Sequence, residues 1–228
     1  FTALLFFSCS VLKSKNSVPN ETRVEMITSE GTVMLKLYNE TPLHRDNFKK
    51  LVDNKFYDGI KFHRVINGFM AQAGDPNSKK DDFKGQLGQN SEGETIPAEI
   101  NPNLFHKKGA LSAARMGDNV NPEKQSSGSQ FYIVPGRKLS LKQLTQMESS
   151  INQKIKKYQQ TENNVQFSDS AKKIYKEIGG TPFLDNGYTV FGEVTQGREI
   201  VEKIGSGKTE RGEQQIYEGT ILSARNTK

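Results

Sequence analysis

The sequence predicts a mainly β fold: a closed antiparallel sheet, or β barrel, capped by two helices. Short segments in which apolar and polar residues alternate recur along the 228 residues, and this period of two is typical of half-buried strands. Outside one inserted segment the sequence shows two helical patterns, and they do not alternate with the strands as helices do in parallel-sheet folds. A mean hydropathy of −0.69, with 33% hydrophobic residues, indicates one modest core beneath a large polar surface.

The first predicted elements are a β hairpin and a helix. Apolar and polar residues alternate on both sides of a Glu-Gly pair at 30–31, which predicts two strands joined by a turn. A Thr-Pro pair at 41–42 gives an N-cap followed by Pro at the first helical position. The apolar residues Phe48, Leu51 and Val52 then recur at helical spacing, so a short amphipathic helix is expected to end near residue 54.

The remaining elements of the sheet are short. A turn at 57–59 leads into a strand that starts at Phe62, and the polar, Gly-rich residues 75–94 predict a long surface loop. A second short helix is expected over 197–204. Further β segments are predicted at 110–113, 130–134, 188–194 and 216–224.

Residues 137–180 interrupt this pattern and predict an inserted helical hairpin. Ser140 and Gln143 have the spacing of a capping box, and a stripe at three- and four-residue steps follows, formed by Leu144, Met147, Ile151, Ile155 and Tyr158. A second helix is expected over 169–178, ended by Gly179, with inward-facing Ala171, Ile174 and Ile178. Two interpretations remain open: the stripe packs on the barrel, or it forms a substrate-facing lip or a partner surface.

Residues 1–20 are predicted to be a truncated lipoprotein-like signal followed by a flexible tether, and residues 21–228 a single domain. An apolar run ends in a small residue before Cys9, and polar residues follow, as in bacterial lipoprotein signals that are cleaved before a lipidated Cys. Lipidation at Cys9 would place the protein in the cell envelope, on the periplasmic side of a bacterial membrane. The alternative is a buried N-terminal strand with an ordinary Cys. A single Cys also excludes an intrachain disulfide and a thiolate zinc site.

The positive charge does not predict a nucleic-acid site. The formal net charge is +6 and the pI about 9.2, but Lys-Lys pairs are spread along the chain with acidic residues between them, which favours solvated faces. His44 and His106 have no partners at the spacing of metal ligands, so neither a metal nor another cofactor is expected. We expect a monomer that contacts a membrane only through the lipid at Cys9.

The segment 62–75 carries the most specific signal for a site. Arg64 and Gln72 are an even number of positions apart, so on neighbouring strands or on one continuous face their polar groups can converge. Phe69 and Met70 supply apolar surface next to them. This combination predicts a binding site made of hydrogen-bond donors and apolar walls, without a nucleophile.

Five motifs taken together resemble the successive signatures of the cyclophilins. They are Phe62-His63-Arg64-Val65-Ile66, Phe69-Met70-x-Gln72-x-Gly74-Asp75, Gly109-x-Leu111-Ser112, Ser129-Gln130-Phe131-Tyr132-Ile133 and Phe191-Gly192-Glu193-Val194. Apart from the insertion, their order and spacing are similar to those of the family from about Thr22 to the C-terminus. The resemblance implies an eight-stranded antiparallel β barrel closed by two helices, and peptidyl-prolyl cis-trans isomerase activity.

The resemblance also implies roles for individual residues. Arg64 would be the catalytic arginine, acting with Gln72, and Gln72 and Gln130 would hydrogen-bond the peptide. The walls of the proline pocket, and the strand beside which the peptide lies, are expected to come from Phe69, Met70, Ala114, Arg115, Phe131, Phe183, Leu184 and Tyr188.

Three of these positions depart from the common pattern of the family. Phe183 stands where many relatives have Trp, and it keeps an aromatic wall but lacks the indole N–H donor. Tyr188 replaces a frequent His, and Arg115 a frequent Asn. These departures leave isomerase chemistry in place but disfavour tight binding of cyclosporin.

The chemistry that the resemblance implies needs neither a nucleophile nor a cofactor, because no bond is broken. Rotation about the bond before proline has a barrier of about 18–20 kcal/mol, which comes from amide resonance. A protonated Arg aimed at the prolyl nitrogen stabilises the twisted amide more than either planar form. The expected function is isomerisation that assists the folding of exported proteins, with proline-containing peptides and unfolded or folding chains as partners. The alternative is a non-catalytic chaperone or proline-peptide binding module.

Overall fold

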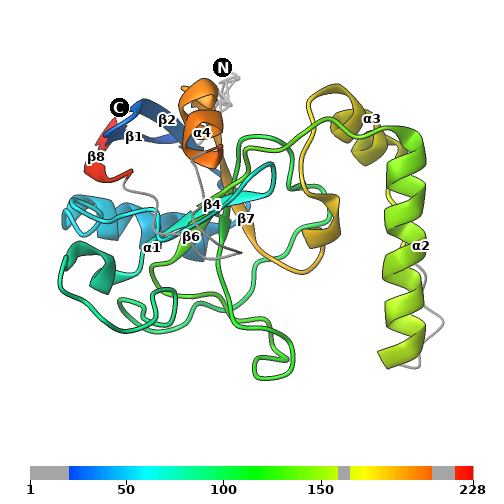
Figure 1. The fold of residues 1–228 in the computed structure, drawn as a ribbon, viewed down its shortest axis with the longest axis horizontal. Coiled ribbons are helices and arrows are strands. Elements are labelled where there is room, and N and C mark those ends of the chain that lie inside the picture. Colours follow the sequence, from blue (N-terminus) through cyan, green and yellow to red (C-terminus); the bar gives the residue numbers. More distant parts are fainter. Residues whose placement is uncertain (1–20, 159–164, 207–218, 228) are drawn as a thin grey trace, which may run out of the picture.

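A computed structural model describes residues 21–158, 165–206 and 219–227, so the predicted signal and tether, with Cys9, lie outside the described residues. Figure 1 shows a β-rich body with one long helix standing beside it. The strands are β1 (Thr22–Thr28), β2 (Gly31–Leu37), β3 (Arg64–Ile66), β4 (Met70–Ala73), β5 (Ala110–Ala113), β6 (Phe131–Ile133), β7 (Val190–Gln196) and β8 (Ile221–Thr227). The helices are α1 (Pro42–Asp53), α2 (Leu141–Tyr158), α3 (Asp169–Glu177) and α4 (Arg198–Gly205), with 3-10 turns η1 (Pro76–Lys79) and η2 (Pro182–Leu184).

These strands form one eight-stranded antiparallel sheet in the order β3-β4-β6-β5-β7-β2-β1-β8. The mainly β, antiparallel fold is confirmed, but the prediction of a closed barrel is wrong, because the sheet is open. The edge strand β3 has three residues and begins only at Arg64. Within the described residues, the chain before β3 meets the chain before β8 through an isolated bridge between Lys61 and Thr220. The short edge strand therefore leaves the sheet curved but unclosed.

The alternation of the strands buries one face of the sheet and confirms the predicted hairpin. Val24 pairs with Leu35 and Met26 with Val33, and all four side chains are buried. Helix α1 packs on β1, β7 and β8, while α4 packs on β2, β3 and β4. The two predicted capping helices therefore cover the sheet, and their buried apolar residues are Phe48, Leu51, Val52, Val201 and Ile204.

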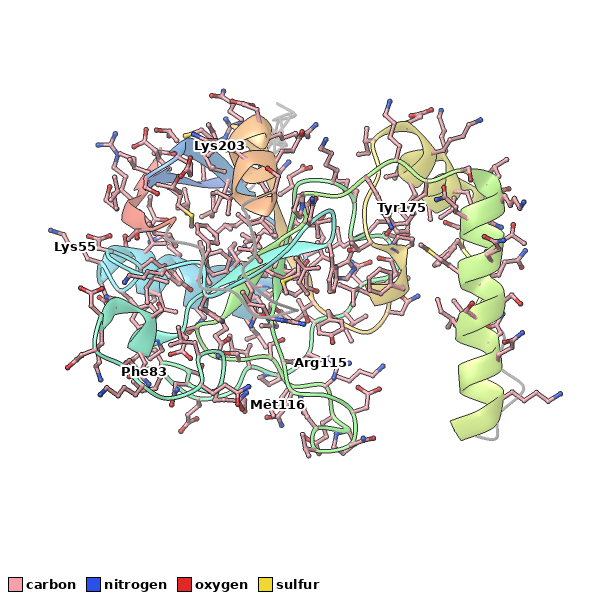
Figure 2. The ribbon with its side chains drawn as sticks, in the orientation of Figure 1. Lys55, Phe83, Arg115, Met116, Tyr175 and Lys203 are labelled. Atoms are coloured by element: carbon pink, nitrogen blue, oxygen red, sulfur yellow. The ribbon has the colours of Figure 1, made fainter. Side chains whose placement is uncertain are left out.

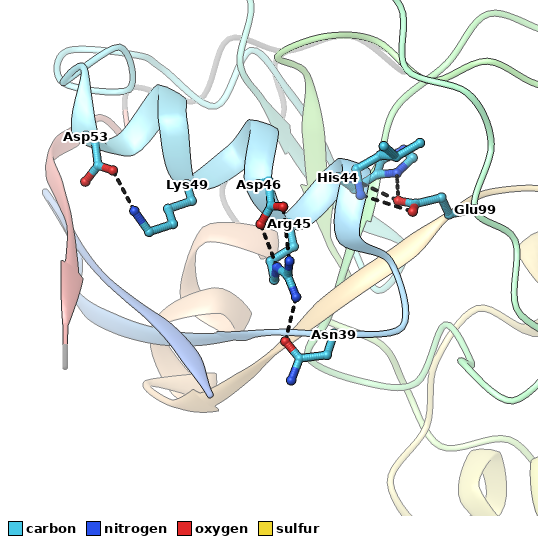
Figure 3. Close-up of polar contacts among 8 residues, drawn as sticks. Asn39, His44, Arg45, Asp46, Lys49, Asp53 and Glu99 are labelled. Carbon is cyan, nitrogen blue, oxygen red and sulfur yellow. Dashed lines mark hydrogen bonds and ion pairs between the residues drawn. The ribbon is translucent and has the colours of Figure 1, made fainter. Parts of the chain in front are cut away.

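A distant carboxylate fixes the start of α1. The predicted cap, Thr41, is buried but makes no capping hydrogen bond with its side chain, so this detail of the prediction is wrong. Glu99 replaces it, because its carboxylate accepts hydrogen bonds from the N–H groups of Leu43 and His44, each at 3.0 Å (Figure 3). A negative charge there also suits the positive end of the helix dipole. Burial lowers the pKa of His44, although its hydrogen bond with Glu99 acts in the opposite direction.

The insertion forms a small core of its own. Gln143 N–H donates to Ser140 Oγ at 3.3 Å and Ser140 N–H donates to Gln143 Oε1 at 2.8 Å, which confirms the capping box. Helix α2 packs against α3 and η2, and Figure 1 shows it standing away from the sheet. In α3 the fully buried aromatic residue is Tyr175, whereas the predicted Ile174 and Ile178 are only half-buried. The buried residues of this core are Leu139, Leu144, Phe167, Ala171 and Tyr175.

Some predicted boundaries differ from those observed. The strand predicted at 188–194 starts at Val190 and continues to Gln196. The last strand starts at Ile221, and the first residues predicted for it, 216–218, lie outside the described ranges. The side chains of Ile155 and Tyr158, predicted for the stripe of α2, are also outside the part that the structure describes. No helix in the described ranges combines the length and the apolar character needed to cross a bilayer.

Candidate active site

The pairing of β3 with β4 brings the two predicted polar residues together. Arg64 is the direct partner of Gln72 across this hairpin, so both side chains point to the same face. The intervening pair, Val65 and Ala71, is buried in the core on the opposite face. A turn with Gly68 at φ +69° joins the strands, a backbone conformation that glycine adopts without strain. The convergence predicted from the even spacing is therefore present.

A cavity of about 240 Å³ opens over this face; we call it the Arg64 cavity. Eight of the predicted site residues line it: Arg64, Phe69, Met70, Gln72, Ala114, Arg115, Leu184 and Tyr188. The Arg64 side chain is half-buried, and no residue in the described ranges forms a hydrogen bond or an ion pair with its guanidinium. Its donors are therefore available to a ligand in the cavity.

Phe131 is not a wall of this cavity, contrary to the prediction. It is 1% exposed and lies in the main core, in edge-on contact with Phe48 and Tyr57. The next residue, Tyr132, lines the cavity instead. Because successive side chains of β6 point to opposite faces, only one of these two aromatic residues can face the cavity.

Arg115 is held rigidly, in contrast to Arg64. Its guanidinium donates to the carbonyl oxygens of Gly187 at 2.7 Å and Met116 at 2.8 Å, and it pairs with Asp118 at 2.7 Å. It also lies over the ring of Tyr188, 4.4 Å from the centroid. Figure 2 labels Arg115 and Met116 on the segment that follows β5. With its charge already compensated, Arg115 serves as a wall of the cavity rather than as a free cation.

Gln72 connects the cavity to a neighbouring loop. Its Nε2 donates to Gln130 Oε1 at 2.9 Å, and Gln130 Nε2 in turn donates to the carbonyl oxygens of Gly88 and Asn90. Gln130 does not line the Arg64 cavity but an adjoining one of about 400 Å³, which shares Gln72. Gln130 therefore holds Gln72 and the loop in place, and it faces a ligand only in the second cavity.

Phe183 lies at the rim and is 46% exposed. It is absent from the lining of the Arg64 cavity, but its ring centroid is 5.2 Å from that of Phe69, which does line it. The residue after it, Leu184, lines the cavity directly. Phe183 thus extends the apolar wall outward from the cavity.

A buried polar network behind the cavity could not be predicted. Tyr175 OH donates to Asp185 Oδ2 at 2.5 Å, and Asp185 Oδ1 accepts from the backbone N–H of His106 at 2.9 Å. His106 Nδ1 is also 2.9 Å from Asp185 Oδ1, and its Nε2 is 3.0 Å from the hydroxyl of Tyr132. Burial raises the pKa of both tyrosines, so their hydroxyl groups stay protonated. The network links the insertion to a residue of the cavity.

His63 lies beside Arg64 in the sequence but is only 4% exposed. Burial lowers the pKa of His63 to about 4, against a smaller opposing effect of Asp75, so it is neutral near neutral pH. In the described ranges, no three His, Cys, Asp or Glu side chains are grouped closely enough to hold a metal ion. The arrangement offers a free cation, an amide and apolar walls, which suit binding and polarisation of a peptide group.

The profile of the cyclophilin type peptidyl-prolyl cis-trans isomerase/CLD family matches residues 23–226. A relative from Staphylococcus haemolyticus, assigned by name as a peptidyl-prolyl cis-trans isomerase, is 33% identical over 211 residues, covering 92% of this chain and 93% of the relative. A relative from Staphylococcus aureus (strain USA300) with the same assignment is also 33% identical, covering 92% of this chain and 94% of its own length.

A solved structure has the same fold. The crystal structure of a cyclophilin type peptidyl-prolyl cis-trans isomerase from Cryptosporidium parvum aligns with a TM-score of 0.64 at 22% identity, covering 91% of this chain and 98% of that one. A second crystal structure of that protein, in the presence of the dipeptide Ala-Pro, aligns with a TM-score of 0.62 at 21% identity, covering 90% and 99%. Since the family profile and the relatives extend over most of its length, the chain belongs to the cyclophilin-type peptidyl-prolyl cis-trans isomerase family.

Proposed function

We propose that Arg64 catalyses rotation about the Xaa-Pro bond by stabilising the twisted amide. As the bond twists, resonance is lost and a lone pair localises on the prolyl nitrogen. A protonated guanidinium can donate to this lone pair, and the donation is strongest in the twisted state, which is the condition for catalysis. The observation that carries this proposal is that Arg64 lines the cavity without a partner in the described part of the chain.

The other cavity residues have supporting roles in this proposal. Phe69, Met70 and Leu184 hold the proline ring, and Gln72 hydrogen-bonds the peptide, with its amide oriented by Gln130. Excluding water from the cavity strengthens the contact between Arg64 and the substrate. No covalent intermediate is formed. An acceleration on the order of a hundred-thousandfold requires about 7 kcal/mol of transition-state stabilisation.

The substitution Arg64→Ala tests this assignment. We expect kcat/KM for a short proline peptide in a protease-coupled assay to fall about a hundredfold, the usual effect of losing one transition-state donor. Arg23→Ala is a matched control, because Arg23 lies in β1 with its side chain 47% exposed and pairs only with Glu21 in the described ranges. A fully active Arg64→Ala protein would refute the assignment.

Proline-containing peptides are the proposed substrates, and the related Cryptosporidium parvum protein studied with Ala-Pro supports this class. In unfolded or folding proteins such peptides are accessible, so we propose that the protein assists the folding of exported proteins as a monomer.

The apolar run that precedes Cys9 supports export and lipidation at Cys9, with the protein on the periplasmic side of the cell envelope. Mass spectrometry of membrane-extracted protein should then find a chain that begins at acylated Cys9. Soluble protein with an unmodified Cys9 would contradict this.

A further inference from the structure

A third hollow lies outside both the Arg64 cavity and the adjoining one, between the insertion and the turn η2. Its volume is about 350 Å³, and it is lined by Gln143, Gln146, Met147, Ser150, Ile151 and Phe183. We call it the α2 groove. Figure 1 shows α2 running alongside the body, with η2 on the side that faces it.

The lining of the α2 groove has the chemistry of a site for extended peptide. Met147 and Ile151 are half-buried at its floor, where the core of the insertion supports them from behind. The polar residues of the lining, Gln143, Gln146 and Ser150, are all neutral. Amide and hydroxyl groups can donate to and accept from a peptide backbone, while a flexible Met adapts to different apolar side chains. An extended, uncharged, partly apolar chain matches this surface.

The α2 groove adjoins the Arg64 cavity, and a pair of aromatic rings in contact lies between the two. Phe183 lines the groove and lies 5.2 Å, between ring centroids, from Phe69 in the cavity. The adjoining cavity that Gln130 lines lies at another end, because it shares Gln72 and Arg115 with the Arg64 cavity but not Phe69 or Leu184. When the proline of a peptide occupies the Arg64 cavity, only the residues on one side of that proline can therefore reach the groove.

The wall between groove and cavity is held in place by the polar network. Asp185 directly follows η2, so its hydrogen bonds fix the turn that carries Phe183. One of these bonds comes from Tyr175 in the insertion, and the chain continues through His106 to Tyr132 in the cavity. The groove and the cavity are thus braced against each other before a ligand binds, which lowers the ordering cost of binding.

We infer that the α2 groove binds the residues that flank the proline on one side of a substrate chain, and that it favours apolar side chains there. The inference rests on the proposed proline site in the Arg64 cavity. It makes the insertion a determinant of substrate length and sequence, so that chains reaching the groove are isomerised more efficiently than minimal peptides.

The test compares kcat/KM for a blocked tetrapeptide with kcat/KM for two longer peptides, which extend it with leucines on either the N-terminal or the C-terminal side. The variant is Met147→Gln with Ile151→Gln, which keeps side-chain volume and helix propensity but makes the floor polar. Leu141→Gln is the matched control, because Leu141 is also in α2, is 54% exposed and does not line the groove.

For one of the two extensions, we expect the double variant to lower the ratio of long-peptide to tetrapeptide kcat/KM about tenfold, equivalent to about 1.4 kcal/mol of binding free energy. The Leu141→Gln control should keep the wild-type ratio. Unchanged ratios for both extensions, in a double variant with wild-type helical circular dichroism, would overturn the inference. Failure of wild-type protein to isomerise the tetrapeptide would instead refute the proposed function, so the two results are distinguishable.

A photo-crosslinking experiment on the wild-type protein gives an independent result. The peptide that benefits from extension carries a photoreactive leucine in its extension and is irradiated in the complex. Crosslinks to residues 143–151 or to Phe183 are expected. Crosslinks confined to the adjoining cavity lined by Gln130 would overturn the inference, even if the substitutions alter turnover.

Discussion

The hydrogen bond that Tyr175 donates to the carboxylate of Asp185 is expected to contribute more to stability than a hydrogen bond from a buried tyrosine to a neutral acceptor. Tyr175 is completely buried, the side chain of Asp185 is only 9% exposed, and 2.5 Å separates the hydroxyl oxygen from Oδ2. A hydrogen bond to a charged group contributes about 1.5–3 kcal/mol, whereas a neutral one contributes about 1 kcal/mol. Tyr175→Phe removes the charged bond without removing the ring.

Tyr57→Phe provides the matched comparison, because Tyr57 is 1% exposed and its hydroxyl donates to the neutral carbonyl oxygen of Ser129 at 3.1 Å. We expect Tyr175→Phe to cost about 2 kcal/mol and Tyr57→Phe about 1 kcal/mol in urea unfolding. At about 2–4 °C per kcal/mol for a chain of this size, the melting temperatures should fall by about 6 °C and 3 °C. If Tyr57→Phe lowers the free energy of unfolding as much as Tyr175→Phe does, or more, the Tyr175–Asp185 hydrogen bond does not make the larger contribution inferred for it.

Two further predictions concern residues beside the site. Burial lowers the pKa of His63 to about 4, so below about pH 6.5 the unfolded chain binds a proton that the folded chain does not. The free energy of unfolding therefore decreases as the pH is lowered. Between about pH 7.5 and pH 5, urea unfolding should show that wild-type protein loses about 2 kcal/mol more than His63→Gln; parallel pH profiles would contradict this. Phe131→Ala should cost about 3–5 kcal/mol of stability, because Phe131 fills the core, and a loss below about 1 kcal/mol would contradict that placement.

Local sequence patterns predicted the elements and the central pair of the site. Alternation located β1 and β2, the Pro at 42 marked the start of α1, and the capping box at Ser140 marked that of α2. The even spacing of Arg64 and Gln72 was enough to place them on one face, because a tight turn joins their strands. These features depend on residues that are close together in the chain.

Features that depend on distant residues or on small differences in packing were not predictable. Phe131 and Tyr132 are adjacent, aromatic and both buried, so alternation cannot show which one faces the core. The cap of α1 comes from Glu99, which is more than fifty residues from the helix start. The polar network spans 79 residues between His106 and Asp185, and no local signal relates the two.

The most direct test of the account is how Arg64→Ala divides its effect between kcat and KM. The two constants can be separated by following peptide exchange at saturating and at low substrate concentrations. If Arg64 acts on the twisted amide, kcat and kcat/KM should fall together by about a hundredfold while KM stays within about twofold. A rise in KM with an unchanged kcat would show that Arg64 only holds the planar substrate, and it would contradict the proposed mechanism.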